Sequence, residues 1–530
     1  MGTRGYYVLR YRNIYFAQYH NSDSYPEGLG VNVLETMQHH NAIATYRQVL
    51  GEILDGVQSL SDSLIIIEGG DDFSPPSRVR PKNDIFIEWI YEVDLDRNIF
   101  HINGMPFFSL ECLPSTYDFT EYVSEDHYGN LACASRCPPE HRYKRPTPPT
   151  VNDSGIATYQ SFTCTGSHVA LSDLLAISDF PSPDERIRIS LLEVMIGQCM
   201  VSRAIAKHVY DIELLFDHSQ LMDDQWSIAC FMASITFVPQ IYDNISHIYH
   251  LEPKRKEFTW VREDTVVCIA THLDDERCLQ ASVSRLINAI MEQKHNPGEY
   301  FGIAFSVYHC AIVKVVKDAH TTTFSHTNAL QFLPSFYASS PSTPGITALA
   351  RLGFRIDPAL FERAVEICYH NRFRDKTRKF VQGVDSSDDV PSNTTCPPLP
   401  FELWKEIALY LYYYELTPFG LVSKLFREVA STVLRHPHVC GYRLVADSRT
   451  KKIKDKRHSL RAATFSAVRA GNIPASVIVG LQFKGEEPQR INMPLTVKHE
   501  SLWVLFSAID ETVPKTADKK LVGDGQLNPS

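Results

Sequence analysis

The stretch LPFELWKEIALYLYYYELTPFGLVSKLFREVA, residues 399–430, contains two apolar patterns with helical spacing. Leu403, Ile407 and Leu411 recur every fourth residue, so on an α-helix they form one apolar stripe. The second pattern consists of five apolar residues at helical intervals: Leu421, Val422, Leu425, Phe426 and Val429. Pro418 fits this second helix if Thr417 is its N-cap and Pro418 its first residue. The stretch therefore predicts two amphipathic helices.

The order of residue types in this stretch resembles the F-box, the short helical motif by which a substrate receptor docks on the Skp adaptor of a cullin-RING ubiquitin ligase. The residues that carry the resemblance are Leu399, Pro400, Glu402, Leu403, Ile407, Leu411, Glu415, Leu416, Val422, Ser423, Lys424, Phe426 and Arg427. The stretch departs from the usual pattern at Phe426, where Trp is commoner. It also departs at Pro418 and Gly420, which fall inside the usual second helix, and Gly420 would cost about 1 kcal/mol relative to Ala in a helix interior.

The resemblance implies a receptor without catalytic residues of its own, which presents a protein substrate of unknown identity while other subunits transfer ubiquitin. Its partners would be the Skp adaptor and, through it, the cullin. The residues expected in or beneath the apolar contact with the adaptor are Leu399, Pro400, Leu403, Ile407, Leu411, Leu416, Val422 and Phe426. Such a surface is typical of helix-in-groove recognition, in which a few buried anchors carry most of the binding energy.

Two alternatives stay open at this point. Residues 1–380 could form an enzyme of unknown type that carries the F-box as an accessory, or a scaffold under which the F-box-like helices are buried. A pocket in which Arg4, Asp23 and Tyr25 converge would favour the enzyme, with Asp23 as base and Arg4 holding an anionic substrate. The other interpretation is that Asp23 satisfies turn backbone groups and Arg4 pairs with a carboxylate.

The long region before the F-box, residues 1–380, resembles a family of uncharacterised fungal proteins. The segments that carry this resemblance include GTRG at residues 2–5, DSYPEGLG at 23–30, HVALSDLL at 168–175 and ASITFVPQ at 233–240. The resemblance implies no chemistry. It indicates one long architectural unit rather than an activity.

Composition limits the class of protein. A net charge of −10 over 530 residues gives no reason to expect a nucleic-acid partner. No run of about 18 apolar residues predicts a membrane span, and the amino terminus does not resemble a signal peptide. The 12 cysteines are scattered singly, mostly in apolar surroundings, which is typical of reduced thiols. We therefore expect a soluble protein of the cytoplasm, the nucleus or both, without membrane contact.

The pattern along the chain predicts a multi-domain α+β fold. A β-hairpin with a turn at Arg12-Asn13 opens it, a helix over residues 31–60 follows, and a second hairpin turns around residues 96–98. Residues 300–316 read as one or two buried strands within a mainly helical region. The expected units are an α+β domain at 1–135, a Pro-rich linker or surface excursion at 136–155, a mainly helical region at 156–380, a flexible linker at 381–396, the F-box at 397–440, a small α/β segment at 441–512 with a short helix, and a disordered tail at 513–530.

Several other groups of residues are of types that bind metal or catalyse reactions, but they lack the spacing or local motif that such sites require. A zinc site from His127, Cys133, Cys137 and His141 would need spacings other than those present, so neither a metal nor a cofactor is expected. The groups His320, Ser325, His326 and His272, Asp274, Asp275 lack a local motif for a nucleophile, and the two aspartates fit the first turn of a helix. Residues 69–72 read as a turn. The basic run KKIKDKR at 451–457 is either a nuclear localisation signal or a solvated surface segment.

Overall fold

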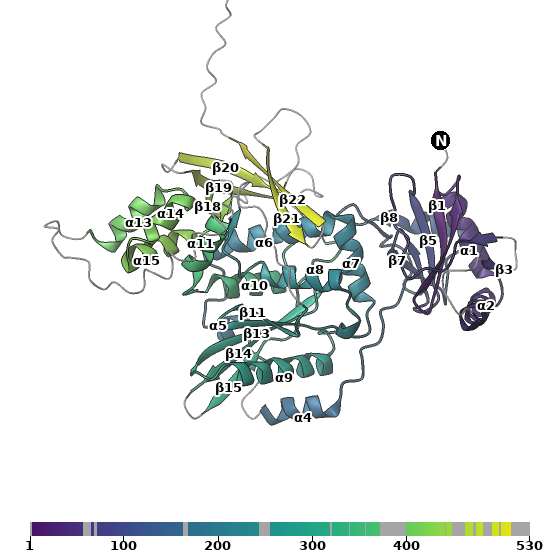
Figure 1. Cartoon of the computed structure of the whole chain (residues 1–530), viewed down its shortest axis with the longest axis horizontal. Helices are drawn as coiled ribbons and strands as arrows, with labels where there is room; N and C mark the ends of the chain where they lie inside the picture. Colours follow the sequence, from purple (N-terminus) through teal and green to yellow (C-terminus); the bar gives the residue numbers. More distant parts are fainter. Residues whose placement is uncertain are drawn as a thin grey trace, which may run out of the picture.

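The structure is a computed structural model, which describes residues 3–56, 65–67, 71–162, 168–242, 255–318, 321–338, 340–355, 357–370, 399–439, 441–447, 462–469, 473–480, 490–497 and 500–509. The described residues form an α+β structure of several sheets and helical layers, as the sequence predicts. Figure 1 shows a unit from the amino-terminal part at one end, a central unit, and a helical unit at the opposite end. The predicted linker at 381–396, the tail at 513–530 and the basic run at 451–457 lie outside the described residues.

The amino-terminal unit is built on a sheet with the strand order β2-β1-β5-β6-β7. Its strands and helices are β1 (Gly5–Tyr11), β2 (Ile14–His20), β5 (Trp89–Asp94), β6 (Ile99–Ile102), β7 (Met105–Ser109), η1 (Pro26–Gly30), α1 (Val31–Gln38), α2 (Ala42–Gly56) and α3 (Thr116–Tyr122). Both predicted hairpins are confirmed. Arg12 and Asn13 have φ of 50° and 59°, the left-handed pair that a tight two-residue hairpin turn requires. Leu9, Leu34 and Phe100 are among the side chains buried in its core.

Three local predictions in this unit need correction. The helix expected over residues 31–60 is two helices, α1 and α2, because Asn41 adopts a left-handed φ of 63° between them. Residues 57–60 lie outside the described part. The turn expected at 69–72 is also wrong in part, since Asp71 and Asp72 belong to β4 (Asp71–Phe73), which pairs with β3 (Ile65–Ile67). A further hairpin pairs β8 (Val123–Glu125) with β9 (Leu131–Cys133).

The central unit contains a sheet with the order β11-β12-β13-β14-β15, to which β16 adds beside β14. Its elements are β11 (Phe258–Arg262), β12 (Thr265–Ile269), β13 (Gly298–Phe305), β14 (His309–Lys317), β15 (Thr322–His326), β16 (Leu330–Gln331), α4 (Asp153–Phe162), α5 (Leu171–Leu175), α6 (Pro183–Val201), α7 (Arg203–Glu213), η2 (His218–Gln220), α8 (Asp223–Ser234), α9 (Glu276–Gln293) and α10 (Pro344–Phe354). Helices α4 and α9 cover one face, while α8 and α10 lie on the other (Figure 1). Strands at 300–316 are confirmed as β13 and β14, but this region holds more strand than expected.

A third sheet has the strand order β10-β17-β18-β19-β20-β22-β21. Its strands are β10 (Ile241–Tyr242), β17 (His438–Val439), β18 (Tyr442–Asp447), β19 (Ala463–Arg469), β20 (Ile473–Val479), β21 (Arg490–Val497) and β22 (Glu500–Ile509). The parallel pair β10–β17 joins it to the central unit, and Phe465 and Val477 share a core with α6. The short helix expected within 441–512 is not present in its described residues, which form strands. The sequence pattern gave no sign that a strand before residue 250 belongs to the same sheet.

Within the described ranges, no single helix has both the length and the apolar character that crossing a membrane requires. Only α6 and α7 taken together meet these criteria, and they are bent by 90° at their junction.

Candidate functional site

The stretch that resembles the F-box folds as three helices, all within the fully described residues 399–439. They are α13 (Phe401–Leu409), α14 (Tyr413–Gly420) and α15 (Lys424–Leu434). The amide of Tyr412 donates to the Glu415 carboxylate at 2.8 Å at the start of α14, and the Ser423 hydroxyl accepts from the Phe426 amide at 3.2 Å at the start of α15. These side chains satisfy amides that have no partner inside the first turn of a helix.

Two expectations about the helix boundaries were wrong. Leu411 does not continue the first helix, because α13 ends at Leu409 and Leu411 lies half-buried in the following turn. Pro418 does not begin a helix capped by Thr417 but lies inside α14. Proline cannot donate to the carbonyl four residues earlier, that of Tyr414, and this carbonyl instead accepts from the Thr417 hydroxyl at 3.0 Å.

Gly420 is required by packing. A Cβ at this position would lie 2.2 Å from Cε2 of Phe361 and 3.1 Å from Cβ of Ala430, closer than side chains tolerate. Phe361 belongs to α11 (Leu360–His370), so α14 approaches α11 and α15 more closely than a larger residue would permit. Leu416 is fully buried in the same core. The three helices and α11 therefore form one packed unit, and the helix-propensity cost of Gly420 is offset by this contact.

The outer side of the unit exposes large apolar side chains. Leu403 is 49% exposed and Ile407 is 40% exposed on α13, and Leu399 and Tyr410, which flank this helix in the sequence, are exposed as well. We call these four residues the docking stripe. Isolated exposed apolar residues are ordinary on proteins, but several of them gathered on and beside one short helix are typical of an interaction surface.

A second exposed apolar group lies at the start of α15. Val422 is 65% exposed and Leu425 is 39% exposed. Phe426 is half-buried, and its ring packs edge-on against Trp404 of α13 with centroids 4.5 Å apart. This ring pair holds α15 against α13, so the docking stripe and the Val422 group lie on neighbouring helices.

The structure divides the residues predicted for adaptor binding into three sets by their exposure. Leu399, Pro400, Leu403, Ile407 and Val422 are exposed, Leu411 and Phe426 are partly exposed, and Leu416 is buried beneath them. Sequence reasoning missed Tyr410 and Leu425. The helical spacing from Ile407 to Tyr410 was the signal that could have found the first of these.

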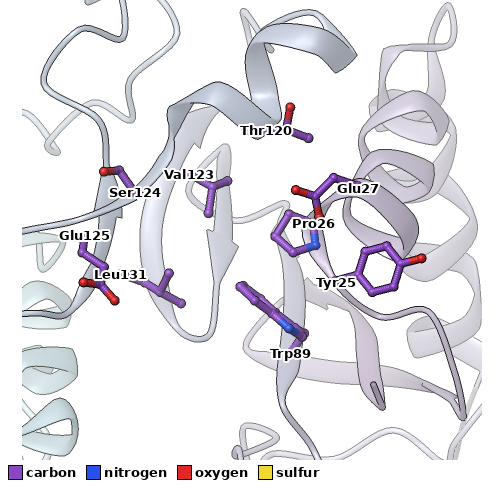
Figure 2. Close-up of a pocket in the computed structure, with 9 residues that line it drawn as sticks. All are labelled: Tyr25, Pro26, Glu27, Trp89, Thr120, Val123, Ser124, Glu125 and Leu131. Atoms are coloured by element: carbon purple, nitrogen blue, oxygen red, sulfur yellow. The ribbon is translucent and has the colours of Figure 1, made fainter. Parts of the chain in front are cut away.

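The residues considered for an enzyme site do not converge. The Arg4 guanidinium lies 5.9 Å from the centre of the Phe86 ring, and the Asp23 carbonyl accepts from the Leu29 amide inside a turn. Tyr25 instead lines an open cavity whose lining includes neither Arg4 nor Asp23 (Figure 2). The interpretation of Asp23 as a turn residue is therefore the one that fits the geometry.

The structure brings together only part of the group considered for zinc: the thiols of Cys133 and Cys137 are in contact, whereas the two histidines have other partners. His127 Nδ1 lies 2.9 Å from the Ala338 carbonyl oxygen, whereas His141 Nδ1 lies 2.9 Å from the carbonyl oxygen of Cys112. Burial raises the pKa of the Cys133 thiol, which favours the neutral form over the thiolate that binds metal.

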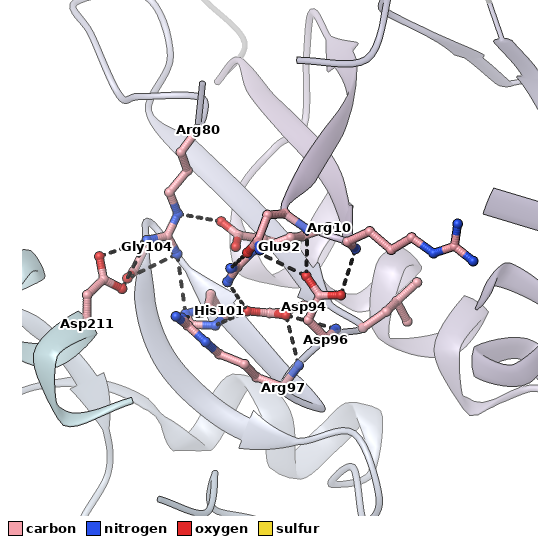
Figure 3. A network of polar contacts seen from close by, with 12 residues as sticks. Arg10, Arg80, Glu92, Asp94, Asp96, Arg97, His101, Gly104 and Asp211 are labelled. Atoms are coloured by element: carbon pink, nitrogen blue, oxygen red, sulfur yellow. Dashed lines mark hydrogen bonds and ion pairs between the residues drawn. The ribbon is translucent and has the colours of Figure 1, made fainter. Parts of the chain in front are cut away.

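Glu92, Asp94 and His101 bring one ligand atom each within 4.8 Å of one another, the only group of this kind in the described part of the chain. Figure 3 shows that this group belongs to a wider charge network. Asp94 Oδ2 accepts from Arg10 Nη1 at 2.5 Å, and Arg80 Nε donates to Glu92 Oε2 at 2.6 Å. Two guanidinium charges therefore already balance the two carboxylates, so the residues present do not fit a divalent cation.

The same network joins two units. Arg80 Nη1 lies 3.2 Å from both carboxylate oxygens of Asp211, which belongs to α7. Burial acts to raise the pKa of Asp211, but the charges of Arg80, Arg97 and other nearby cations together lower it below the ordinary value. Burial also acts to raise the pKa of Asp94, but His101, whose Nε2 lies 3.8 Å from Oδ2, and the charge of Arg10 lower it below the ordinary value. We interpret the network as a structural connection between the amino-terminal sheet and α7.

A small cavity lies at the carboxyl ends of β12 and β13, an edge at which α/β sheets often bind ligands. Its lining includes His272 and Glu213, and Arg145 pairs with Glu213 at 3.3 Å and with Asp274 at 3.2 Å. The cavity volume of about 10 Å³ has room for one water molecule. The expectation that Asp274 and Asp275 lie in the first turn of a helix is wrong, because α9 begins at Glu276. Asp275 is instead its N-cap and accepts from the Cys278 amide at 3.0 Å.

The last group considered for catalysis was His320, Ser325 and His326, and only the latter two lie within the described residues. His320 lies outside them, and His326 is fully buried with Nε2 2.7 Å from the Tyr159 hydroxyl. A buried histidine held by a tyrosine needs no ligand to satisfy it.

Comparisons of the chain with protein-family models, with curated proteins and with solved structures found no match. Any functional inference therefore rests on the residues themselves and on their geometry.

Proposed function

We propose that this chain is an F-box substrate receptor, which docks on the Skp adaptor of a cullin-RING ubiquitin ligase through residues 399–434 and presents a protein substrate. The observation that carries the proposal is the docking stripe. Leu403 and Ile407 expose apolar side chains on the outer side of α13, while the inner side packs into a core with α11. The helix thus offers a partner one apolar face on a rigid support.

The energetics favour a partner for this face. Burying a large aliphatic side chain releases about 1.5–3 kcal/mol relative to leaving it exposed, so Leu403, Ile407 and Val422 each have stabilisation to gain. In interfaces of this kind a few anchors cost about 2 kcal/mol or more when truncated. Docking would therefore depend on these side chains, with Leu416 holding the helices in position from below.

The arrangement of the molecule is suited to a receptor. Helices α13–α15 and the amino-terminal sheet lie at opposite ends of the longest axis (Figure 1). An adaptor on α13 would leave the amino-terminal unit free to contact the substrate. The chain would meet the adaptor in the cytoplasm or the nucleus, and ubiquitin transfer would take place on other subunits.

Co-purification tests the proposal. The full chain, expressed together with the Skp adaptor, is expected to retain the adaptor through affinity and size-exclusion steps, and changing both Leu399→Ala and Pro400→Ala is expected to weaken this association. Ile85→Ala is the matched control, because Ile85 is an aliphatic residue 88% exposed in a different unit. Failure of the unchanged chain to retain the adaptor contradicts the proposal.

The alternative of a scaffold with buried F-box-like helices predicts that the Leu403 and Ile407 side chains are covered, whereas both are exposed. The enzyme alternative predicts a convergent site in residues 1–380. Arg4 and Asp23 do not share a cavity with Tyr25, so the receptor is the function that the geometry supports best.

A further inference from the structure

A cavity lies in the amino-terminal unit, between the segment at residues 25–27 and the β8–β9 hairpin. Its volume is about 600 Å³. Figure 2 shows Pro26 and Trp89 on one side, with Val123 and Leu131 facing them across the opening. A space of this size accommodates a long side chain together with part of the backbone that carries it. We call it the amino-terminal cavity.

One wall of this cavity is held firmly in place. Asp23 has a left-handed φ of 51°, and a Cβ on Gly28 would lie 2.2 Å from the Asp23 carbonyl oxygen. Ser24 is fully buried, and its carbonyl accepts from the Tyr91 hydroxyl at 3.0 Å. Gly30 in turn packs directly on the Tyr91 ring. The stretch DSYPEGLG is therefore shaped so that its middle residues border a preformed cavity, which lowers the ordering cost of binding.

The lining combines aromatic, aliphatic and acidic groups. Trp89 stacks on Tyr91 with ring planes 3° apart, so one of its faces is already covered by a ring. Glu27 and Glu125 supply two exposed carboxylates at the border of the cavity. Among the described residues that line it, none is Lys, Arg or His. The cavity thus presents the ring of Trp89 together with the exposed carboxylate of Glu27.

We infer that the amino-terminal cavity binds a basic side chain, arginine or lysine, of an extended peptide segment in the protein substrate. The charged end would lie between Glu27 and the Trp89 ring, where a carboxylate and a ring face both attract a cation. The aliphatic stem would pack against Val123 and Leu131. This inference deepens the proposed function and rests on it, because it names the part of the substrate that the receptor recognises.

The test uses the full-length chain and a fluorescein-labelled octapeptide of alternating Arg and Ala, with an octapeptide of alternating Glu and Ala for comparison. Fluorescence anisotropy is expected to give saturable binding of the basic peptide and at least about tenfold weaker binding of the acidic one. Glu27→Gln and Trp89→Leu are each expected to weaken binding of the basic peptide by about fivefold or more. Glu35→Gln, which removes an exposed carboxylate from α1 in the same unit, is the matched control and is expected to leave binding unchanged.

Three results would overturn the inference. Equal weakening by Glu35→Gln and Glu27→Gln would mean that the peptide is held by the general negative charge of the chain. Equal affinity for the two peptides would remove the charge argument. Displacement by spermine at a lower concentration than by unlabelled basic peptide would identify a site for free polycations. Retention of the Skp adaptor by both variants separates this inference from the proposed function, because the adaptor would bind at the other end of the molecule.

Discussion

Arg80 connects the amino-terminal sheet to α7, and Arg80→Met tests how much that connection contributes to stability. Methionine keeps an unbranched apolar stem but removes the guanidinium that binds Glu92 at 2.6 Å and Asp211 at 3.2 Å. The Glu92 and Asp211 side chains are only 1% and 9% exposed, so water replaces the lost partner poorly. Removing one partner of a buried ion pair costs about 3–5 kcal/mol. Because the Arg80 side chain is itself 16% exposed, the lower end of this range, about 3 kcal/mol, is expected.

The penalty should depend on pH in a defined direction. With Arg80 present the pKa of Asp211 is lowered, so the pair contributes stability above the unfolded pKa of about 3.9 and loses it as the pH falls through the folded value. In Arg80→Met the lowering of the Asp211 pKa by Arg80 is lost while burial still acts to raise it, so protonation relieves part of the cost of this buried carboxylate. The difference between the two proteins is therefore expected to be full at pH 7 and to shrink below about pH 5.

Urea denaturation followed by tryptophan fluorescence measures this difference, with Trp89 reporting from the affected sheet. Arg78→Met is the matched control, because Arg78 is an exposed residue in the same segment and its loss should change stability by less than about 0.5 kcal/mol. Equal stability of the Arg80 and Arg78 variants would refute the reasoning, as would an Arg80→Met penalty that does not change between pH 7 and pH 4.

The remaining predictions concern the helical unit. Gly420→Ala should cost about 1–3 kcal/mol of unfolding free energy in chemical denaturation because its methyl group would overlap the Phe361 ring, and Phe361→Leu in the same chain should recover part of that loss. Burial lowers the pKa of His438 to about 3. The unfolded chain binds a proton at this histidine below its pKa of about 6.5, so the folded state should lose about 2 kcal/mol of stability between neutral pH and pH 5. His438→Asn should flatten this part of the stability–pH curve. Leu416→Ala should cost about 2–5 kcal/mol whereas Leu403→Ala should cost less than about 0.5 kcal/mol, and equal costs for the two in thermal denaturation would contradict the assignment of core and surface.

Local patterns determined what could be predicted from the sequence. The alternation of residues 5–19 and the turn at Arg12-Asn13 predict the first hairpin because both act over neighbouring residues. The spacing of Leu403 and Ile407 likewise predicts α13 and its apolar side. Helix α14 was missed because Pro418 and Gly420 suggest a helix boundary. Its stability depends on the Thr417 hydroxyl and on the Phe361 ring, and the second of these lies far away in the sequence.

The features that could not be predicted from the sequence depend on residues that are far apart along the chain. The strands β10 and β17 are only two residues long, so neither has a recognisable strand pattern in the sequence. Their partners are far apart along the chain, since Ile241 pairs with His438. Arg80 and Asp211 are separated by 131 positions, and no local motif indicates that they meet. The same limit applies to the candidate site. Periodicity places Leu403 in a helix but not Leu416, and the packing around α11 determines that Leu416 is buried while Leu403 is exposed.

The most direct test of the central claim is the dissociation constant between the full chain and the purified Skp adaptor, measured by isothermal titration calorimetry. Saturable one-to-one binding is predicted, with at least about a hundredfold loss of affinity when both Leu403→Ser and Ile407→Ser are introduced. Ile85→Ser, which changes a more exposed aliphatic residue in another unit, should leave the constant unchanged. No binding by the unchanged chain, or the same loss from Ile85→Ser as from the pair on α13, would contradict the assignment of the docking stripe as an adaptor-binding surface.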